Sequence, residues 1–166
     1  MSVHFPQMRV AGIILKDDEV LLMDRNNHGR KYFSFIGGGV EEGESYEDAL
    51  CREIKEEASI EVKIEKFIYS LDCSQPFGGR TGQRVYLCRY ISGVAQLGES
   101  EEKEDNEKGL NTFQPVWVSI AQLNHIAEVY PTQIKKWLIK DYPNNFINTP
   151  RTYMVEVRKG RLAENE

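Results

Sequence analysis

The first part of the chain alternates between short apolar runs and polar turns, a pattern that predicts strands. The runs Val10 to Leu15 and Val20 to Met23 flank the polar segment Lys16 to Glu19. Apolar runs separated by such a short polar segment are typical of a β-hairpin. A third run, Phe33 to Ile36, enters three consecutive glycines, Gly37 to Gly39. We therefore expect strands that lead into a glycine-rich loop.

A helix is predicted directly after the glycines. Ser45 is a suitable N-cap residue and Asp48 follows three positions later, a spacing that favours the start of a helix at this point. We expect the helix to run to about Ala58. Ser59 follows at the helix end, where the left-handed backbone that often ends a helix costs a residue other than glycine about 1 kcal/mol. The helix end should be slightly altered, with the residues before it left in place.

The second half of the chain is predicted to contain four further strands and two helices. High contents of β-branched and aromatic residues predict the strands Ile60 to Leu71, Arg84 to Ile91, Pro115 to Ser119 and Tyr153 to Val157. The predicted helices are Ile120 to Glu128 and Thr132 to Tyr142. This mixture predicts an α/β (α+β) fold, with a mixed sheet covered by helices, in one domain of residues 1–166.

Composition limits the choice of partners. The formal net charge is −5, which argues against a nucleic acid polymer or an anionic membrane as a partner, because both bind clustered cations. No apolar run approaches the length of about 18 residues that a membrane helix needs, and no signal sequence is evident, so we expect a cytoplasmic protein. The three cysteines are widely spaced and predict neither a disulfide framework nor a zinc site.

The predicted helix carries three glutamates on one face. Glu53, Glu56 and Glu57 stand at spacings i, i+3 and i+4, within about one third of the helix circumference. A solvated acidic face is the alternative interpretation. Like charges at this spacing repel, however, and Mg²⁺ or Mn²⁺ would offset them by binding carboxylate oxygen. The preceding glycines offer exposed carbonyl oxygens as neutral ligands, so the two features together predict a metal site.

The spacing across both features resembles the signature of the Nudix hydrolases. Five residues separate Gly38 from Glu44, seven separate Glu44 from Arg52, and the segment Arg52 to Ile60 completes the signature over residues 38–60. Ser59 is the one departure within the signature, since the family has glycine there, and Ile36 is a second departure just before it, where many members have proline. The chain resembles a MutT-type member, which implies a Nudix-type α/β/α sandwich with a mixed sheet. The resemblance is compatible with a homodimer, although no segment of the sequence must pair.

The resemblance also implies a reaction and roles for residues. The expected reaction is Mg²⁺- or Mn²⁺-dependent hydrolysis of a phosphoanhydride in a nucleoside diphosphate linked to another group, such as a nucleoside triphosphate. Glu53, Glu56 and Glu57 would bind the metal together with a backbone carbonyl of Gly37 or Gly38. Arg52 would orient the glutamates through charge-assisted hydrogen bonds, and Glu44 would support the loop or the water shell of the metal.

Other contacts are less constrained by the sequence. The general base is Glu53 or a glutamate of the acidic stretch that contains Glu99, Glu101 and Glu102. Basic residues that could contact phosphate are Arg25, Arg30, Lys31, Arg80 and Arg84, each of which could equally form a surface ion pair. The alternative functions are an ADP-ribose or nucleotide-sugar pyrophosphatase and a catalytically silent module that binds a nucleotide. Pro76, sixteen residues after Ile60, has a spacing seen in ADP-ribose-cleaving relatives.

Overall fold

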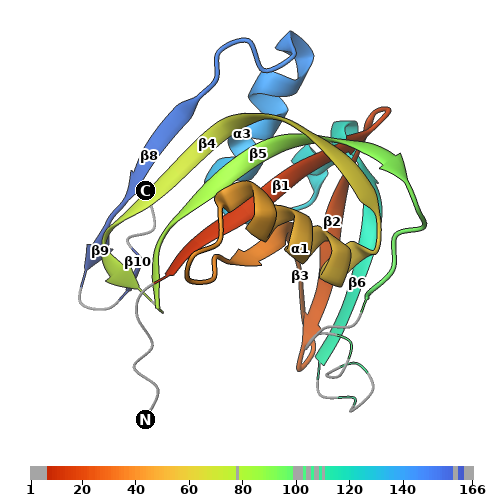
Figure 1. Ribbon diagram of the computed structural model, residues 1–166, viewed down its shortest axis with the longest axis horizontal. Coiled ribbons are helices and arrows are strands. Elements are labelled where there is room, and N and C mark those ends of the chain that lie inside the picture. Colours follow the sequence, from red (N-terminus) through yellow and green to blue (C-terminus); the bar gives the residue numbers. More distant parts are fainter. Residues whose placement is uncertain are drawn as a thin grey trace.

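The computed structural model describes residues 7–77, 79–98, 103, 106, 109, 111–158 and 161–162. Its main feature is a mixed eight-stranded sheet with strand order β6-β2-β3-β1-β5-β4-β8, in which β7 pairs with β3 (Figure 1). The strands of this sheet are β1 (Gln7–Lys16), β2 (Glu19–Asn27), β3 (Arg30–Gly39), β4 (Glu61–Phe77), β5 (Arg80–Ser92), β6 (Asn111–Ser119), β7 (Val129–Tyr130) and β8 (Arg151–Val155). Strands β9 (Val157–Arg158) and β10 (Arg161–Leu162) pair with each other.

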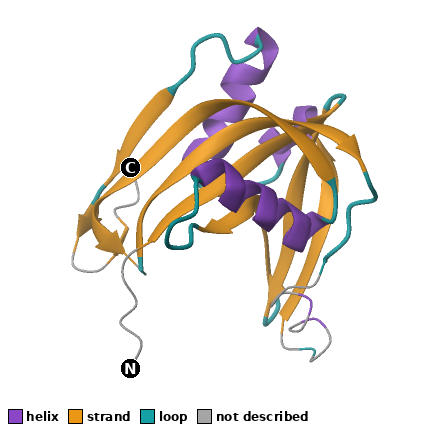
Figure 2. Ribbon diagram, in the orientation of Figure 1, coloured by secondary structure: helices purple, strands orange, loops and turns teal. Residues whose placement is uncertain are grey.

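Helices cover both faces of the sheet (Figure 2). They are α1 (Tyr46–Ala58), α3 (Thr132–Asp141) and the 3₁₀ helices η1 (Ile120–His125) and η2 (Tyr142–Asn144). Alternate residues of β1 pack into two hydrophobic cores, one on each face of the sheet. Ile14 packs with Leu50 and other residues of α1, whereas Ile13 packs with Ile134 and Leu138 of α3. The expected α/β/α sandwich with a mixed sheet is confirmed. Within the described residues no helix has the length and apolarity needed to span a membrane.

The local predictions for the first half are largely confirmed. The hairpin forms between β1 and β2, with Leu15 opposite Val20. Helix α1 starts after Ser45, whose Oγ accepts a hydrogen bond from the backbone N of Asp48 at 3.1 Å. It ends at Ser59 in the left-handed conformation, with φ 56° and ψ 27°. The glycines differ from the prediction, because Gly37 to Gly39 continue β3 and pair with β1 rather than forming a loop.

The helix predicted over Ile120 to Glu128 is shorter than expected and of the 3₁₀ type. It is η1, which ends at His125, and β7 follows it as a short strand parallel to β3. Val129 is buried in the core at this point, and the backbone N of Phe33 donates to the carbonyl of Glu128 at 2.9 Å. Burial of a β-branched residue and sheet pairing therefore outweigh helical spacing. The last predicted strand starts two residues early, at Arg151.

Candidate active site

A cleft of about 590 Å³ lies where the glycine end of β3 meets α1. One wall is the acidic face of α1, and another carries arginines from β1, β2 and β5. The structure brings these residues together around the cleft: Arg9, Arg25, Tyr32, Ser34, Phe35, Gly37, Gly38, Gly39, Glu41, Arg52, Glu53, Glu56, Glu57, Arg80, Gln83, Tyr130 and Pro131. The three glutamates predicted from helical spacing thus face one cavity, as do Arg52 and both predicted glycines.

The absence of side chains at Gly37 and Gly38 allows close packing of β3 against β1 and against α1, respectively. A Cβ atom at Gly37 would lie 2.0 Å from the carbonyl oxygen of Val10 on β1. At Gly38 it would lie 2.3 Å from the carboxyl carbon of Glu53. Gly37 is therefore required by the sheet backbone, whereas Gly38 leaves room for a carboxylate of α1.

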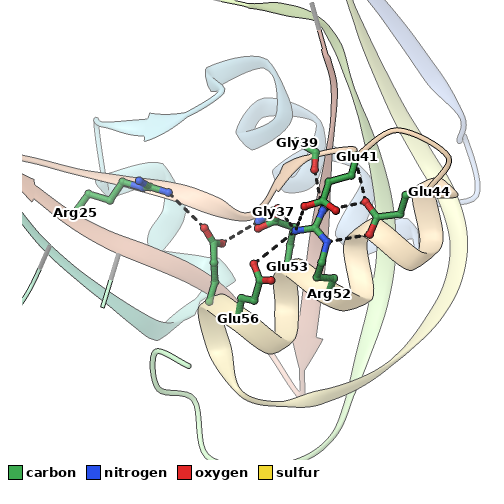
Figure 3. Close-up of polar contacts among 9 residues, drawn as sticks. Arg25, Gly37, Gly39, Glu41, Glu44, Arg52, Glu53 and Glu56 are labelled. Carbon is green, nitrogen blue, oxygen red and sulfur yellow. Dashed lines mark hydrogen bonds and ion pairs between the residues drawn. The ribbon is translucent and has the colours of Figure 1, made fainter. Parts of the chain in front are cut away.

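Arg52 organises the acidic residues around it (Figure 3). Its Nε and Nη2 donate to the two carboxylate oxygens of Glu44, each at 2.9 Å. Nη2 also donates to the carbonyl of Gly39 at 3.0 Å, and Nη1 donates to Oε1 of Glu53 at 2.9 Å. Oε2 of Glu56 lies 3.5 Å from Nη1. A guanidinium that binds a carboxylate with two parallel bonds fixes its orientation as well as its charge.

This network shifts the titration of its members. The hydrogen bonds from Arg52, with one from the backbone N of Glu41, lower the pKa of Glu44 to about 2. The same contact with Glu44 raises the pKa of Arg52. Burial raises the pKa of Glu53, and Arg52 opposes that shift. Glu44 and Arg52 are therefore both charged across the neutral pH range, which keeps the ion pair intact.

Glu57 is the most deeply placed of the three glutamates, with only 3% of its surface exposed. Its Oε2 accepts a hydrogen bond from the backbone N of Gly37 at 3.1 Å, and its Oε1 lies 3.8 Å from Nη2 of Arg25. Arg25 is itself fixed, because its Nε donates to Oγ of Ser34 at 2.7 Å and its guanidinium lies over the ring of Phe113. Buried charge is retained here because each group has a partner.

Arg9 was not found by sequence reasoning. Its side chain and that of Arg80 line the cleft, and within the described residues neither guanidinium has a carboxylate within 4.0 Å. Burial and the neighbouring charge of Arg80 lower the pKa of Arg9. The parallel pairing of β1 with β5 brings the two strands together, and neither strand carries a local motif that reveals it. Arg9 interacts electrostatically with Glu57 and Glu53 without an ion pair within 4.0 Å, and with Arg80 beside it this wall carries positive charge that suits an anion.

The model of the NUDIX domain family matches residues 6–138. The chain belongs to the Nudix family. The resemblance inferred from the spacing of residues 38–60 is thereby confirmed.

Two curated relatives of the Nudix chain are informative. It is 35% identical over 103 residues to an ADP-ribose pyrophosphatase from Methanocaldococcus jannaschii, an alignment that covers 60% of each chain. It is 27% identical over 129 residues to the NAD-capped RNA hydrolase NudC from Pseudomonas aeruginosa, covering 76% of this chain and 45% of that one. The Nudix chain thus spans less than two thirds of the length of these relatives.

Solved structures show the same fold. A NUDIX hydrolase from Nitrosomonas europaea superimposes with a TM-score of 0.66 at 17% identity, covering 93% of this chain and 80% of the other. An ADP-ribose pyrophosphatase from Streptococcus suis gives a TM-score of 0.62 at 22% identity, covering 90% and 98%. At these identities the likeness supports the fold.

Several residues predicted from sequence lie outside the cleft lining of this Nudix domain. Arg84 follows Gln83 on β5 and therefore faces the opposite side of the sheet, where it forms an ion pair with Asp72 at 2.7 Å. Arg30 is exposed and lies 3.5 Å from Glu128. Lys31 is exposed on β3. The predicted loop residues Glu99, Glu101 and Glu102 lie outside the described residues.

The donor atoms match the divalent metal that the Nudix family implies. Carboxylate and backbone carbonyl oxygens are the ligands that Mg²⁺ and Mn²⁺ prefer. Among the described residues, however, no three acidic side chains converge on a single point. Oε1 of Glu53 accepts from Arg52, and Oε2 of Glu57 accepts from Gly37. A shared ion therefore requires rotation of side chains on α1, although the residues that would hold it already line one cavity.

Proposed function

We propose that this Nudix domain hydrolyses the phosphoanhydride bond of a nucleoside diphosphate linked to another group, with Mg²⁺ or Mn²⁺. The observation that carries the proposal is a cleft with acidic and basic walls. Three glutamates of α1 line one side of this cavity: Glu53, Glu56 and Glu57. Three arginines line the other side: Arg9, Arg25 and Arg80. A diphosphate is an anion that binds both to guanidinium groups and to metal ions held by carboxylates.

The glutamates of α1 are the proposed metal ligands, with a backbone carbonyl of Gly37 or Gly38. A bound divalent ion supplies Lewis acidity at the phosphate and lowers the pKa of a water molecule. Arg52 is a positioning residue, because its hydrogen bonds hold Glu53 and Glu44 and reach the strand end at Gly39. Loss of such a supporting group costs about 10- to 100-fold in metal affinity or activity.

The arginines of the opposite wall would bind the negatively charged phosphate groups. Arg25 lies beside Glu57, and among the described residues Arg9 and Arg80 have no carboxylate within 4.0 Å, so all three can face phosphate oxygens. The proposed proton acceptor is Glu53 or a glutamate of the acidic stretch; Glu53 lies in the cleft lining, with its side chain 13% exposed and close to Gly38. In-line attack of water on one phosphorus then requires the acceptor and the scissile bond to share this cavity.

We infer that the substrate class is ADP-ribose or a related nucleotide with an organic group on both phosphates. The relative from M. jannaschii is named an ADP-ribose pyrophosphatase, and the aligned segment is 35% identical to this chain. The net charge of −5 supports a small nucleotide over an RNA chain. Nucleoside triphosphates are the competing substrate class, and a silent nucleotide-binding module is the competing function.

A substrate panel tests the proposal. AMP, phosphate and pyrophosphate release would be measured from ADP-ribose, UDP-glucose, diadenosine polyphosphates and nucleoside triphosphates, with Mg²⁺, with Mn²⁺ and with chelator. We expect metal-dependent release of AMP from ADP-ribose, abolished in Glu56→Gln. The control Glu61→Gln alters an exposed residue outside the cleft. Pyrophosphate release from triphosphates alone would contradict the substrate class, and no turnover despite nucleotide binding would favour the silent module.

A further inference from the structure

A second pocket, of about 300 Å³, adjoins the cleft on the α3 face of the sheet. Leu71, Cys73 and Phe77 of β4 and Val155 of β8 give it apolar walls. The pocket and the cleft share four lining residues: Arg9, Arg80, Gln83 and Pro131. The two cavities are therefore neighbouring parts of one surface, the first polar and the second apolar.

The strand register explains this continuity. Gly39 pairs with Arg9, Arg9 with Gln83, and Gln83 with Leu71 across β3, β1, β5 and β4. Paired residues of neighbouring strands lie on the same face, about 4.8 Å apart. The row therefore runs about 14 Å from the glycine end of β3 to the apolar pocket. A ligand held at the glutamates by its phosphates can extend along this row.

The chemistry of the lining selects what can occupy the pocket. A sugar needs many hydrogen-bond partners for its hydroxyl groups, and the apolar walls offer almost none. A nucleobase needs apolar surface for its ring faces and a few polar groups for its edge. Gln83 offers a carboxamide that hydrogen-bonds to no other described residue, and such an amide can pair with the edge of a base. The lining therefore matches a base.

We propose that this apolar pocket binds the nucleobase of the substrate, while Arg9 and Arg80 bind the phosphate next to it. The proposal rests on the proposed function, to which it adds the direction in which the nucleotide lies. The base points toward β4 and β8, and the second organic group lies at the opposite end of the cleft, near Tyr32 and Tyr130.

The aromatic pair Tyr32 and Tyr130 is the competing base site. Their rings meet edge to face with centroids 6.0 Å apart. The guanidinium of Arg30 lies 5.3 Å from the centroid of Tyr32 and 5.7 Å from that of Tyr130. Arg30 and the mutual contact of the rings already take up ring surface that a base would need. Among the described residues, no charged side chain covers the apolar walls of the pocket in this way.

One wall of this pocket, Val155, lies outside the residues that the family match covers. The NUDIX match ends at residue 138, whereas Val155 belongs to β8, the edge strand that runs beside β4 (Figure 1). The wall that closes the pocket thus comes from the C-terminal part of this chain. Val155 is a specificity-determining residue in this proposal, since it touches neither the glutamates nor the glycines of the cleft.

The test is a comparison of AMP with ribose 5-phosphate, which carries a hydroxyl group where AMP carries adenine. Their dissociation constants would be measured by calorimetry with chelator present and no metal. Stacking and burial of a base should make AMP bind at least about tenfold more tightly to the unaltered protein. Val155→Trp, which fills the pocket, should remove that preference and leave ribose 5-phosphate binding unchanged. Arg80→Ala should weaken both ligands to a similar degree.

Met154→Trp is the matched control, because Met154 precedes Val155 on β8 and its side chain is exposed on the other face. It should keep the full preference for AMP. Near-ultraviolet circular dichroism would establish that each variant is folded. If Val155→Trp is misfolded, Phe77→Ala tests the same wall by removing it, and should also reduce the preference.

Two results would overturn the proposal: an unaltered protein without preference for AMP, or a preference that persists in a folded Val155→Trp variant. A persisting preference that disappears in Tyr32→Ala would place the base at the tyrosine pair. Because binding is measured without metal or turnover, an inactive protein can still confirm the pocket. Conversely, ADP-ribose hydrolysis with an unchanged preference in Val155→Trp would refute the pocket alone.

Discussion

Replacement of Gly38 by alanine perturbs the proposed metal site through a single methyl group. The backbone of Gly38 is not in the left-handed region, so alanine suits it. The added Cβ would lie 2.3 Å from the carboxyl carbon and from Oε1 of Glu53, and 2.6 Å from Oε2. Carbon atoms in contact are about 3.5 Å apart, so the carboxylate must move by about 1 Å. The change therefore displaces a carboxylate and leaves the sheet in place.

A displacement of about 1 Å in a catalytic group costs on the order of 100-fold in rate. We expect Gly38→Ala to lower kcat with Mg²⁺ by about that factor and to weaken Mn²⁺ binding. The melting temperature should change little, because the clash falls on a side chain that can rotate. Steady-state hydrolysis of ADP-ribose, Mn²⁺ titration and thermal unfolding provide the three measurements.

Gly39→Ala is the matched control on the same strand. There the new Cβ would lie 2.7 Å from Oε1 of Gln7, an exposed side chain that can turn aside. This variant should lose far less activity than Gly38→Ala. If Gly38→Ala retains its rate within about threefold of the unaltered protein, or if both variants lose activity equally, the reasoning on Glu53 is refuted.

Three further predictions follow from other contacts. Arg52→Lys keeps the charge but loses the paired bonds, and should lower kcat/KM about 10- to 100-fold; full activity would show that the charge suffices. Arg151 lowers the pKa of Asp141, so this pair should stabilise the fold fully above about pH 4 and lose its effect as pH falls further. Asp141→Asn should lower the melting temperature at pH 7 by about 5 °C and flatten its dependence on pH between about 2 and 5, and unchanged dependence would contradict this assignment. Burial raises the pKa of Cys88 to about 12, so a thiol reagent should label exposed Cys51 in the native protein and Cys88 only after unfolding.

The acidic face of α1 could be predicted from sequence because every relationship in it is local. Helical spacing alone brings Glu53, Glu56 and Glu57 to one face, and the N-cap at Ser45 lies where the residue type indicates. The hairpin of β1 and β2 is equally local. In each case a few neighbouring residues decide the structure, so no knowledge of distant pairing is needed.

The opposite wall of the cleft could not be predicted, because it depends on strand pairing. Arg9 reaches Gln83 only because β1 and β5 pair in parallel, and the residue after Gln83 is turned to the other face with its own partner. A shift of one residue in the register would exchange the two faces. The turn from η1 to β7 was missed for the same reason, since burial of Val129 beside β3 is a tertiary effect.

The binding of Mn²⁺ tests the central claim most directly. Its affinity would be measured by electron paramagnetic resonance for the unaltered protein, for Glu56→Gln and Glu57→Gln, and for the exposed control Glu61→Gln. We predict that either change on α1 weakens Mn²⁺ binding by at least about tenfold while the control and the unaltered protein agree. Equal affinity in all four folded proteins would contradict the assignment of the metal to the glutamates of α1.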